Sequence, residues 1–415
     1  MQKRLFFLVT AVLMSISSVF AQVTTSSMSG KVTIGSATGE EVIGATVQAV
    51  HEPSGTRYAA VTNVDGRFAI NGMRTGGPYV VTVSYIGFQT KTLRGITLQL
   101  AENYDLQVWL SEDANELAEV VITGSASKFA GEKTGATTNI NNAQIVNLPT
   151  VNRNITEVTR LSPYGGNGMS FAGSDGRMAN FTVDGADFNN NFGLSDGLPG
   201  GGNPISIDAI EEMQVVISPF DVRQTNFIGG GVNAITKSGT NTFKGSAYVY
   251  HKNENMQGDA IDREQIPGAR EKSQQTTYGF TLGGPIIKNK LFFFLNGEMI
   301  KNPTVVNRWR ASENGVPDAD QYLSRTTTGD MQTVSEYVKN KYGYDTGSFT
   351  SFPANIENYK FLARLDWNIT DDHHLALRYN YTKNTDWRST NASSMDGGVR
   401  SAYARFSQYS MAFAN

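Results

Sequence analysis

Two histidine-containing segments are the first candidates for chemistry in this sequence. His51-Glu52 begins like the zinc-protease motif, in which a second histidine four positions after the first completes the metal site. Gly55 stands at that position, so we expect a surface turn here. His373 and His374 adjoin another predicted turn, and we favour a solvated turn there over a metal site.

A third candidate is Asp187-Phe188-Asn189-Asn190-Asn191, which has oxygen atoms at alternate positions, as calcium-binding loops do. Phe192 stands where such loops need a glycine for their sharp turn, and Leu198 stands where they close with a glutamate. Calcium is therefore disfavoured. We interpret Asn189, Asn190, Asn191 and Phe192 as a loop that contacts a ligand, with simple solvation as the alternative. We assign no catalytic residues, metal ligands or cofactor, and we do not expect an enzyme.

The segment Glu119-Val120-Val121-Ile122-Thr123 is suited to binding a partner through its main chain. Its β-branched core lies between the polar linker 111–116 and a stretch rich in Gly, Ser and Lys. A short segment of this kind can add itself as a strand to the edge of a partner's sheet. The alternative is that it forms the last strand of the domain before it.

The N-terminus reads as an export signal. Lys3 and Arg4 precede the apolar run Leu5–Met14, and Val19-Phe20-Ala21 supplies small residues for signal peptidase, which predicts cleavage after Ala21. The run is short for a transmembrane helix, which must cross ~30 Å of hydrocarbon.

Composition favours strands and turns. The chain has 42 glycines and only 18% charged residues, a pattern unlike that of helical bundles. A net charge of −3 gives no electrostatic case for nucleic acid as a partner. The absence of cysteine excludes disulfides and lipid attachment through an N-terminal Cys.

Residues 28–110 show short alternating runs separated by turns, the pattern of an antiparallel β-sandwich. An Asp65-Gly66 turn precedes Phe68, and the run from Tyr79 to Phe88 follows. These residues resemble the carboxypeptidase regulatory-like domain, a transthyretin-like sandwich. The resemblance implies a structural module and not a peptidase.

Three ordered blocks follow, at 181–185, 208–215 and 230–237, in a Gly- and Asn-rich region where Asn154 opens a short helix. In order and spacing they resemble the plug of TonB-dependent receptors. With a plug behind it, the segment Glu119–Thr123 looks like the TonB box, the element that the protein TonB grips.

From residue 243 the sequence alternates strictly between apolar and polar residues, as a lipid-facing barrel wall requires. We expect six strands, near 243–251, 273–285, 290–300, 358–369, 374–384 and 402–413. Their connections alternate between long and short, which predicts periplasmic turns at 286–289 and 370–373 and extracellular loops elsewhere. Short helices are expected at Asp318–Arg325 and Val334–Lys341.

The predicted fold is therefore mainly β, in five parts: a signal peptide (1–21), a regulatory-like β-sandwich (22–112), a linker with the TonB box (113–127), an α/β plug (128–242), and strands of an antiparallel transmembrane β-barrel (243–415). Plugged outer-membrane transporters have about 22 strands, so six strands predict an incomplete barrel and a truncated receptor.

Within the superfamily, residues 152–163 and 218–224 look most like the Oar-like group. That resemblance implies energised transport of an unidentified ligand through the outer membrane of a Gram-negative bacterium, with the N-terminal domain in the periplasm. The implied partners are TonB with the inner-membrane ExbB/ExbD complex, outer-membrane lipid, the barrel-assembly machinery and a surface lipoprotein. The alternative is export, surface organisation or adhesion rather than nutrient uptake.

Overall fold

The computed structural model describes most of the chain after the predicted signal peptide. The described residues are 24–111, 122–123, 136–189, 198, 203–219, 224, 227–256, 258, 260–261, 264–265, 274–304, 310–318, 323–347, 354–371, 373–389 and 403–414. The predicted cleavage site at Ala21 lies outside them. The described part is mainly β, as the sequence predicts.

The first unit, called the sandwich below, consists of two facing sheets. Its strands are β1 (Ser26–Ile34), β2 (Thr46–His51), β3 (Thr56–Val61), β4 (Arg67–Met73), β5 (Gly76–Ser84), β6 (Lys91–Leu98) and β7 (Asn103–Leu110). One sheet has the order β4-β1-β7, and the other continues from β3 through β2 and β5 to β6. Alternate residues such as Val47, Val81 and Ile96 point between the sheets, where they form one apolar core.

The second unit, called the plug, is a five-stranded sheet with short helices. Its elements are β9 (Ala136–Asn141), α2 (Asn142–Asn147), α3 (Ile155–Thr159), η1 (Gly176–Met178), β10 (Asn180–Val183), β11 (Ala186–Asp187), η2 (Ile207–Ala209), β12 (Ile210–Ser218) and β13 (Gly231–Thr236). The strand order is β11-β10-β13-β12-β9. Asn154 caps α3 as predicted, because its side chain accepts a hydrogen bond from the Thr156 backbone.

The third unit, called the wall, is a six-stranded antiparallel sheet in sequence order. Its strands are β14 (Lys244–Asn253), β17 (Gln274–Ile287), β18 (Leu291–Thr304), β21 (Ala354–Asn368), β22 (His374–Ser389) and β23 (Tyr403–Ala414). Phe280 and Trp367 are nearly half exposed on one face, at 45% and 46%, whereas Lys360 and Asp366 are buried on the other. All six predicted strands are confirmed, and so is the alternation between an apolar outer face and a polar inner face.

The long connections of the wall carry further small elements: η3 (Glu254–Met256), β15 (Ala260–Ile261), β16 (Glu264–Gln265), β19 (Arg310–Ser312), β20 (Leu323–Thr327) and α4 (Thr328–Tyr342). The helix predicted at Val334–Lys341 lies within α4. The helix predicted at Asp318–Arg325 is wrong where the structure describes it, because Leu323 to Arg325 pair with β19 as part of β20. Among the described residues, no helix is both long and apolar enough to span a membrane.

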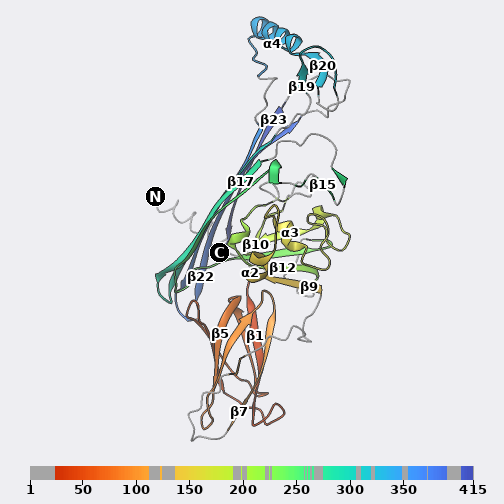
Figure 1. Ribbon diagram of the computed structural model, residues 1–415. Helices are drawn as coiled ribbons and strands as arrows, with labels where there is room; N and C mark the ends of the chain where they lie inside the picture. Colours follow the sequence, from red (N-terminus) through yellow and green to blue (C-terminus); the bar gives the residue numbers. More distant parts are fainter. Residues whose placement is uncertain are drawn as a thin grey trace, which may run out of the picture.

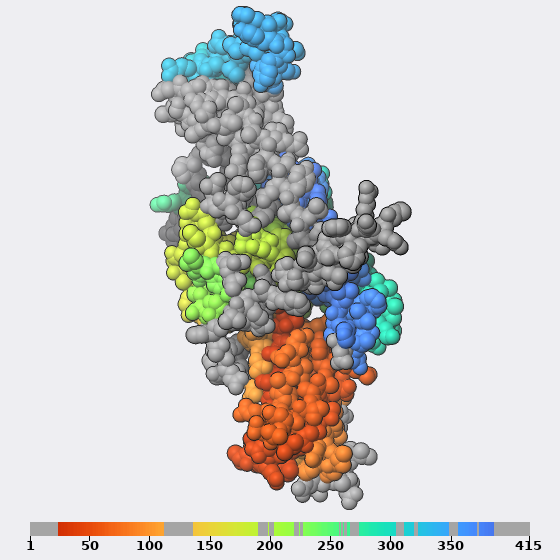
Figure 2. All heavy atoms as spheres, turned by 180° about the vertical axis from the view of Figure 1, so that it is seen from behind, coloured from red at the N-terminus to blue at the C-terminus, as the bar shows by residue number. Residues whose placement is uncertain are grey.

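Figure 1 shows how the units follow one another along the molecule. The sandwich lies at one end, the plug lies in the middle against one face of the wall, and α4 lies at the far end. Seen from behind, the ends of the later wall strands lie directly beside the sandwich (Figure 2). The short turns of the wall therefore lie at the sandwich end, and the long connections lie at the α4 end.

Candidate site between plug, wall and sandwich

The plug is attached to the wall through a carboxylate at the tip of a plug hairpin. Asp184 lies in the turn between β10 and β11, with φ of 50°. Its carboxylate accepts hydrogen bonds from Thr236 at the end of β13, from the backbone N–H at 3.0 Å and from the hydroxyl at 2.6 Å. This fixed carboxylate faces two wall arginines, Arg378 at 3.3 Å and Arg364 at 3.8 Å.

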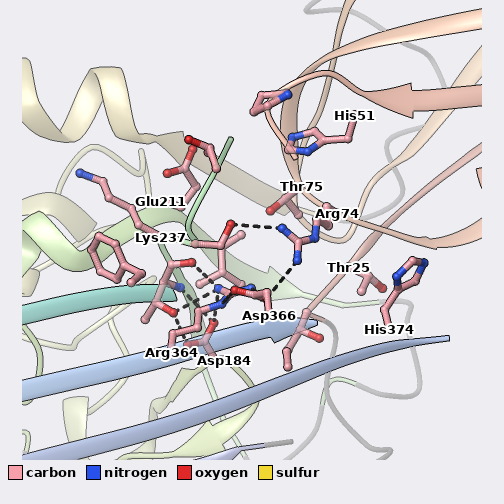
Figure 3. A pocket seen from close by; sticks show the side chains of 18 of the residues that line it. Thr25, His51, Arg74, Thr75, Asp184, Glu211, Lys237, Arg364, Asp366 and His374 are labelled. Atoms are coloured by element: carbon pink, nitrogen blue, oxygen red, sulfur yellow. Dashed lines mark hydrogen bonds and ion pairs between the residues drawn. The ribbon is translucent and has the colours of Figure 1, made fainter. Parts of the chain in front are cut away.

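One of the wall arginines, Arg364, is itself held by a second carboxylate (Figure 3). Arg364 donates from Nε and Nη2 to the two oxygens of Asp366, at 2.8 and 2.9 Å. Arg364 and Asp366 are two residues apart on β21, so both side chains point to the inner face. Asp366 also pairs with Arg74 of the sandwich at 3.2 Å. All three units of the molecule therefore contribute a charged side chain to this cluster, which we call the ionic junction.

A second polar contact joins plug and wall farther from the sandwich. Glu298 of β18 accepts hydrogen bonds from Lys360 at 2.7 Å, from the plug hydroxyl of Ser206 at 2.9 Å and from Tyr248 at 2.9 Å. The Lys360 and Glu298 side chains are only 1% and 3% exposed. A buried pair of this kind persists because every charge has a partner.

Apolar contacts between plug and wall are fewer. Phe294 of β18 and Leu362 of β21 point inward and join the plug core. The plug is therefore seated on the wall by these two apolar side chains, by the two polar clusters and by further polar contacts such as the hydrogen bond from the Thr382 hydroxyl to the Pro204 carbonyl.

A cavity of about 1080 Å³ adjoins the ionic junction and is lined by the sandwich, the plug and the wall. Glu211 and Lys237 of the plug line it, and no hydrogen bond or ion pair joins either side chain to a described residue. Burial raises the pKa of Glu211, although the nearby Lys237 opposes that shift. Burial lowers the pKa of Lys237, and Glu211 opposes that shift in turn. A polar molecule that enters the cavity would meet both of these side chains.

Only part of the predicted TonB box falls within the described residues. Glu119, Val120 and Val121 lie outside them, while Ile122 and Thr123 form the two-residue strand β8. Strand β8 pairs in parallel with Leu93 and Arg94 of β6, at the edge of the sandwich. The two described residues of the segment therefore pair with their own chain, as in the alternative interpretation, and binding of TonB by Glu119–Thr123 stays a prediction.

Of the predicted ligand-contacting loop, only Asn189 is described. Its side chain accepts a hydrogen bond from the Phe181 backbone at 2.7 Å and donates to Asn180, so it fastens the loop to β10. Asn190, Asn191 and Phe192 lie outside the described residues. Ligand contact by this loop stays a prediction.

The prediction of a surface turn at His51-Glu52 is wrong for His51. This residue ends β2 and is 7% exposed, with its ring bonded to the Ser54 hydroxyl at 2.7 Å and its face toward Tyr79. It is buried because it continues the inward-facing positions Val47 and Ala49 of β2. Among the described residues, His, Asp and Glu form no group of three or more able to hold a metal.

The charged residues of the ionic junction were not singled out from the sequence. A signal for two of them was present, because Arg364 and Asp366 occupy polar positions of an alternating strand and must face the lumen. Nothing in the sequence marks Arg74 as their partner, since it lies in a turn of a different domain.

Two family models match the chain. Residues 27–111 match the carboxypeptidase regulatory-like domain, and residues 235–357 match an outer membrane beta barrel domain. The molecule therefore joins a regulatory-like sandwich to an outer-membrane barrel wall with a plug between them, and it resides in the outer membrane of a Gram-negative bacterium.

Among curated proteins, the TonB-dependent transporter Oar of Myxococcus xanthus is 24% identical over 345 residues. The match covers 78% of this chain but only 30% of that protein. The chain is homologous to TonB-dependent transporter Oar, and it spans under a third of the length of that relative.

Solved structures with a similar arrangement include two outer-membrane proteins. The transporter YddB of Escherichia coli has a TM-score of 0.43 and 13% identity, covering 61% of this chain and 34% of its own. The siderophore receptor PirA of Pseudomonas aeruginosa has a TM-score of 0.39 and 17% identity. That match covers 61% of this chain and 35% of the receptor.

Proposed function

We propose that this chain belongs to an energised transporter in which TonB, driven by ExbB/ExbD, pulls on Glu119–Thr123 and displaces the plug. The observation that carries the proposal is the way in which the plug is seated on the wall. Asp184 and Ser206 of the plug bind lumen-facing charged groups of the wall, rather than a broad apolar surface. Such contacts can be exchanged for water when plug and wall separate.

The remaining roles follow from that arrangement. The sandwich lies at the short-turn end, which is the periplasmic end of an outer-membrane barrel. The long connections and the loop Asn189–Phe192 would meet the ligand first. The protein acts as a transporter and not as an enzyme, in line with its homology to Oar. Its ligand is unidentified, and its apolar wall face contacts outer-membrane lipid after assembly by the barrel-assembly machinery.

Export or surface organisation is the second candidate, because the same plug movement could serve either direction. The direction of ligand flow in energised cells separates the two. Accumulation of ligand inside cells favours uptake, whereas its energy-dependent release favours export. A surface lipoprotein that co-purifies with the protein would support the additional partner.

The proposal is tested by Val121→Pro. Proline removes a backbone donor and fixes φ, so it damages pairing with a sheet edge. Uptake by a deletion strain carrying this variant, measured against a panel of peptides, glycans and metal chelates, is expected to be abolished, with surface binding and protein level intact. Asn115→Pro, in the polar linker before the segment, is the matched control and should transport normally. Normal transport by Val121→Pro, or loss of the protein from the membrane, contradicts the assignment.

A further inference from the structure

The sandwich is bound to the plug through a buried turn. Leu100, in the turn between β6 and β7, is fully buried. Its N–H donates to a carboxylate oxygen of Glu212 at 3.0 Å, and its carbonyl accepts from the Gln214 side-chain amide at 2.9 Å. Asn139 of β9 donates to the same carbonyl at 3.1 Å. The turn therefore contacts β9, the edge strand of the plug sheet, and its neighbour β12.

The same end of the sandwich is also bound to the wall. Besides the ion pair between Arg74 and Asp366, the Asn368 amide donates to the Thr56 hydroxyl at 3.0 Å. Arg74 also donates to Ser238 at 3.4 Å, just after the last plug strand. One rigid sandwich thus holds both the plug and the wall, so the plug cannot move far along the wall while the sandwich stays in place.

The cavity beside the ionic junction is closed on one side by the sandwich. His51 and Arg74 of the sandwich line it opposite Lys237 of the plug, as the close view in Figure 3 illustrates. Tyr58 of the sandwich and Arg378 of the wall line it as well. A molecule that passes between plug and wall toward the short-turn end would enter this cavity and meet the sandwich next.

We propose that the sandwich is a second gate, in series with the plug, which keeps plug and wall together until it swings away from the cavity. The inference rests on the proposed transport function and adds a regulatory step to it. The contacts described above are polar, so water can replace each partner when they part. The apolar core of the sandwich lies entirely inside it, so the sandwich can leave without unfolding.

A buried thiol can report the opening of the contact between plug and wall. Leu362 is 2% exposed, faces inward from β21 and packs in the plug core. The 415 residues contain no cysteine, so Leu362→Cys would add a single thiol to them. A membrane-impermeant maleimide added to energised cells should label it only when the plug moves, and a protonophore should prevent labelling. Labelling of the peptide that contains residue 362 is measured by mass spectrometry.

The first arm of the test removes contacts between the sandwich and the wall. Thr56→Ala with Arg74→Ala should raise the labelling rate roughly tenfold, the effect of losing about one charge-assisted hydrogen bond. Arg57→Ala is the matched control, since Arg57 is exposed on the same strand as Thr56, and it should label at the parental rate. A double variant that labels no faster than Arg57→Ala overturns the proposal.

The second arm locks the gate. A Cβ placed on Gly55 of the sandwich would lie 3.3 Å from the Asn289 Cβ in the adjoining wall turn, close to the ~3.5–4.5 Å of disulfides. Gly55→Cys with Asn289→Cys should, when oxidised, prevent labelling at residue 362, and a reductant should restore it. Each single cysteine serves as a control for the strain at these positive φ positions. Parental labelling in the oxidised protein overturns the gate.

Val121→Pro separates failure of the gate from failure of transport. If Val121→Pro abolishes labelling while the two arms change nothing, the gate is wrong and TonB-driven movement of the plug stands. If Val121→Pro labels like the parent, the transport proposal fails, and the gate that rests on it fails as well.

Discussion

The core of the sandwich and the contact between plug and wall are both buried, but they are built from different groups. The sandwich core consists of apolar side chains such as Tyr79, Val81 and Ile96, each at most 1% exposed. The contact between plug and wall buries Glu298, Lys360 and Asp184. Separating apolar surfaces exposes them to water at a cost of about 25 cal/mol per Å². Charged groups that separate are rehydrated, which recovers much of what their pairing contributed.

The difference fits the tasks that the proposed transport gives to the two regions. A sandwich that moves as a body keeps its shape through an apolar core. A plug that is held at rest and released under load is positioned by paired charges, which need no large apolar area. The following predictions test this comparison, from the largest expected effect to the smallest.

Removing one charge of a buried pair should produce the largest effect. Lys360→Ala leaves Glu298 buried without its cation. This should lower the free energy of unfolding of the plug by about 3–5 kcal/mol, measured by urea denaturation of the detergent-solubilised protein. Lys360→Met combined with Glu298→Leu should recover most of that loss, because no unpaired charge remains. Lys288→Ala, on an exposed turn, is the control. If the double variant is as unstable as Lys360→Ala, an unpaired buried charge is not what destabilises Lys360→Ala.

Truncating a core side chain of the sandwich should cost somewhat less. Residues 22–112 expressed alone are expected to be soluble and to unfold in one cooperative step. Ile96→Ala should then lower the free energy of unfolding by about 3 kcal/mol, measured by urea denaturation, because it leaves a cavity in the core. A fragment that aggregates or unfolds without cooperativity would show that the sandwich core depends on the plug.

Acid should weaken the sandwich through His51. Burial, with a smaller contribution from Arg74, lowers the pKa of His51 to about 3. Above the ordinary histidine pKa near 6.5, both folded and unfolded states are neutral, so the group has no effect. As pH falls from about 6.5 toward 3, the unfolded state gains the proton first, and stability should fall by up to about 1.4 kcal/mol per pH unit.

The measurement is the unfolding of the sandwich in the intact protein between pH 7.5 and 5, for the parent and for His51→Gln. The variant should lose less stability than the parent over this range. Equal losses in both proteins would mean that His51 is solvated and titrates normally.

An exposed ion pair of the sandwich should matter least. Lys31 and Glu41 pair at 2.9 Å with both side chains substantially exposed, at 29% and 47%. The hydrogen bond from Lys31 lowers the pKa of Glu41. Glu41→Gln is expected to leave the urea midpoint of the fragment unchanged within error, because water screens such pairs. A clear decrease in the urea midpoint would contradict the expected difference between buried and exposed charges.

The strands of the wall could be predicted because their side chains obey a period of two and their turns alternate in length. Their ends were less accurate: β21 begins at Ala354 and β22 continues to Ser389, beyond the predicted 358 and 384. Pairing between β18 and β21 continues to Thr304 and Ala354, beyond the part of each strand whose sequence alternates between apolar and polar residues. These ends are set by backbone pairing, which the residue pattern does not reveal.

The ionic junction could not be predicted from the sequence, although its members could have been listed. The inward direction of Arg364 and Asp366 follows from alternation. Their meeting with Asp184 and Arg74 depends on how three separately folded units come together. The same holds for Asn368 and Thr56, which are 312 residues apart. A single sequence contains no record of such contacts.

The position of β9 at the edge of the plug sheet has a mechanical consequence. It pairs only with β12, from Ala136 opposite Ser218 to Asn141 opposite Glu212, and the linker enters it at Ala136. Figure 1 draws β9 crosswise to the axis from the sandwich to α4. A pull from the sandwich end along that axis would act across the β9–β12 hydrogen bonds and load them one after another rather than all together. Under the proposed transport, a weak and sustained pull of this kind would open the plug from its β9 edge.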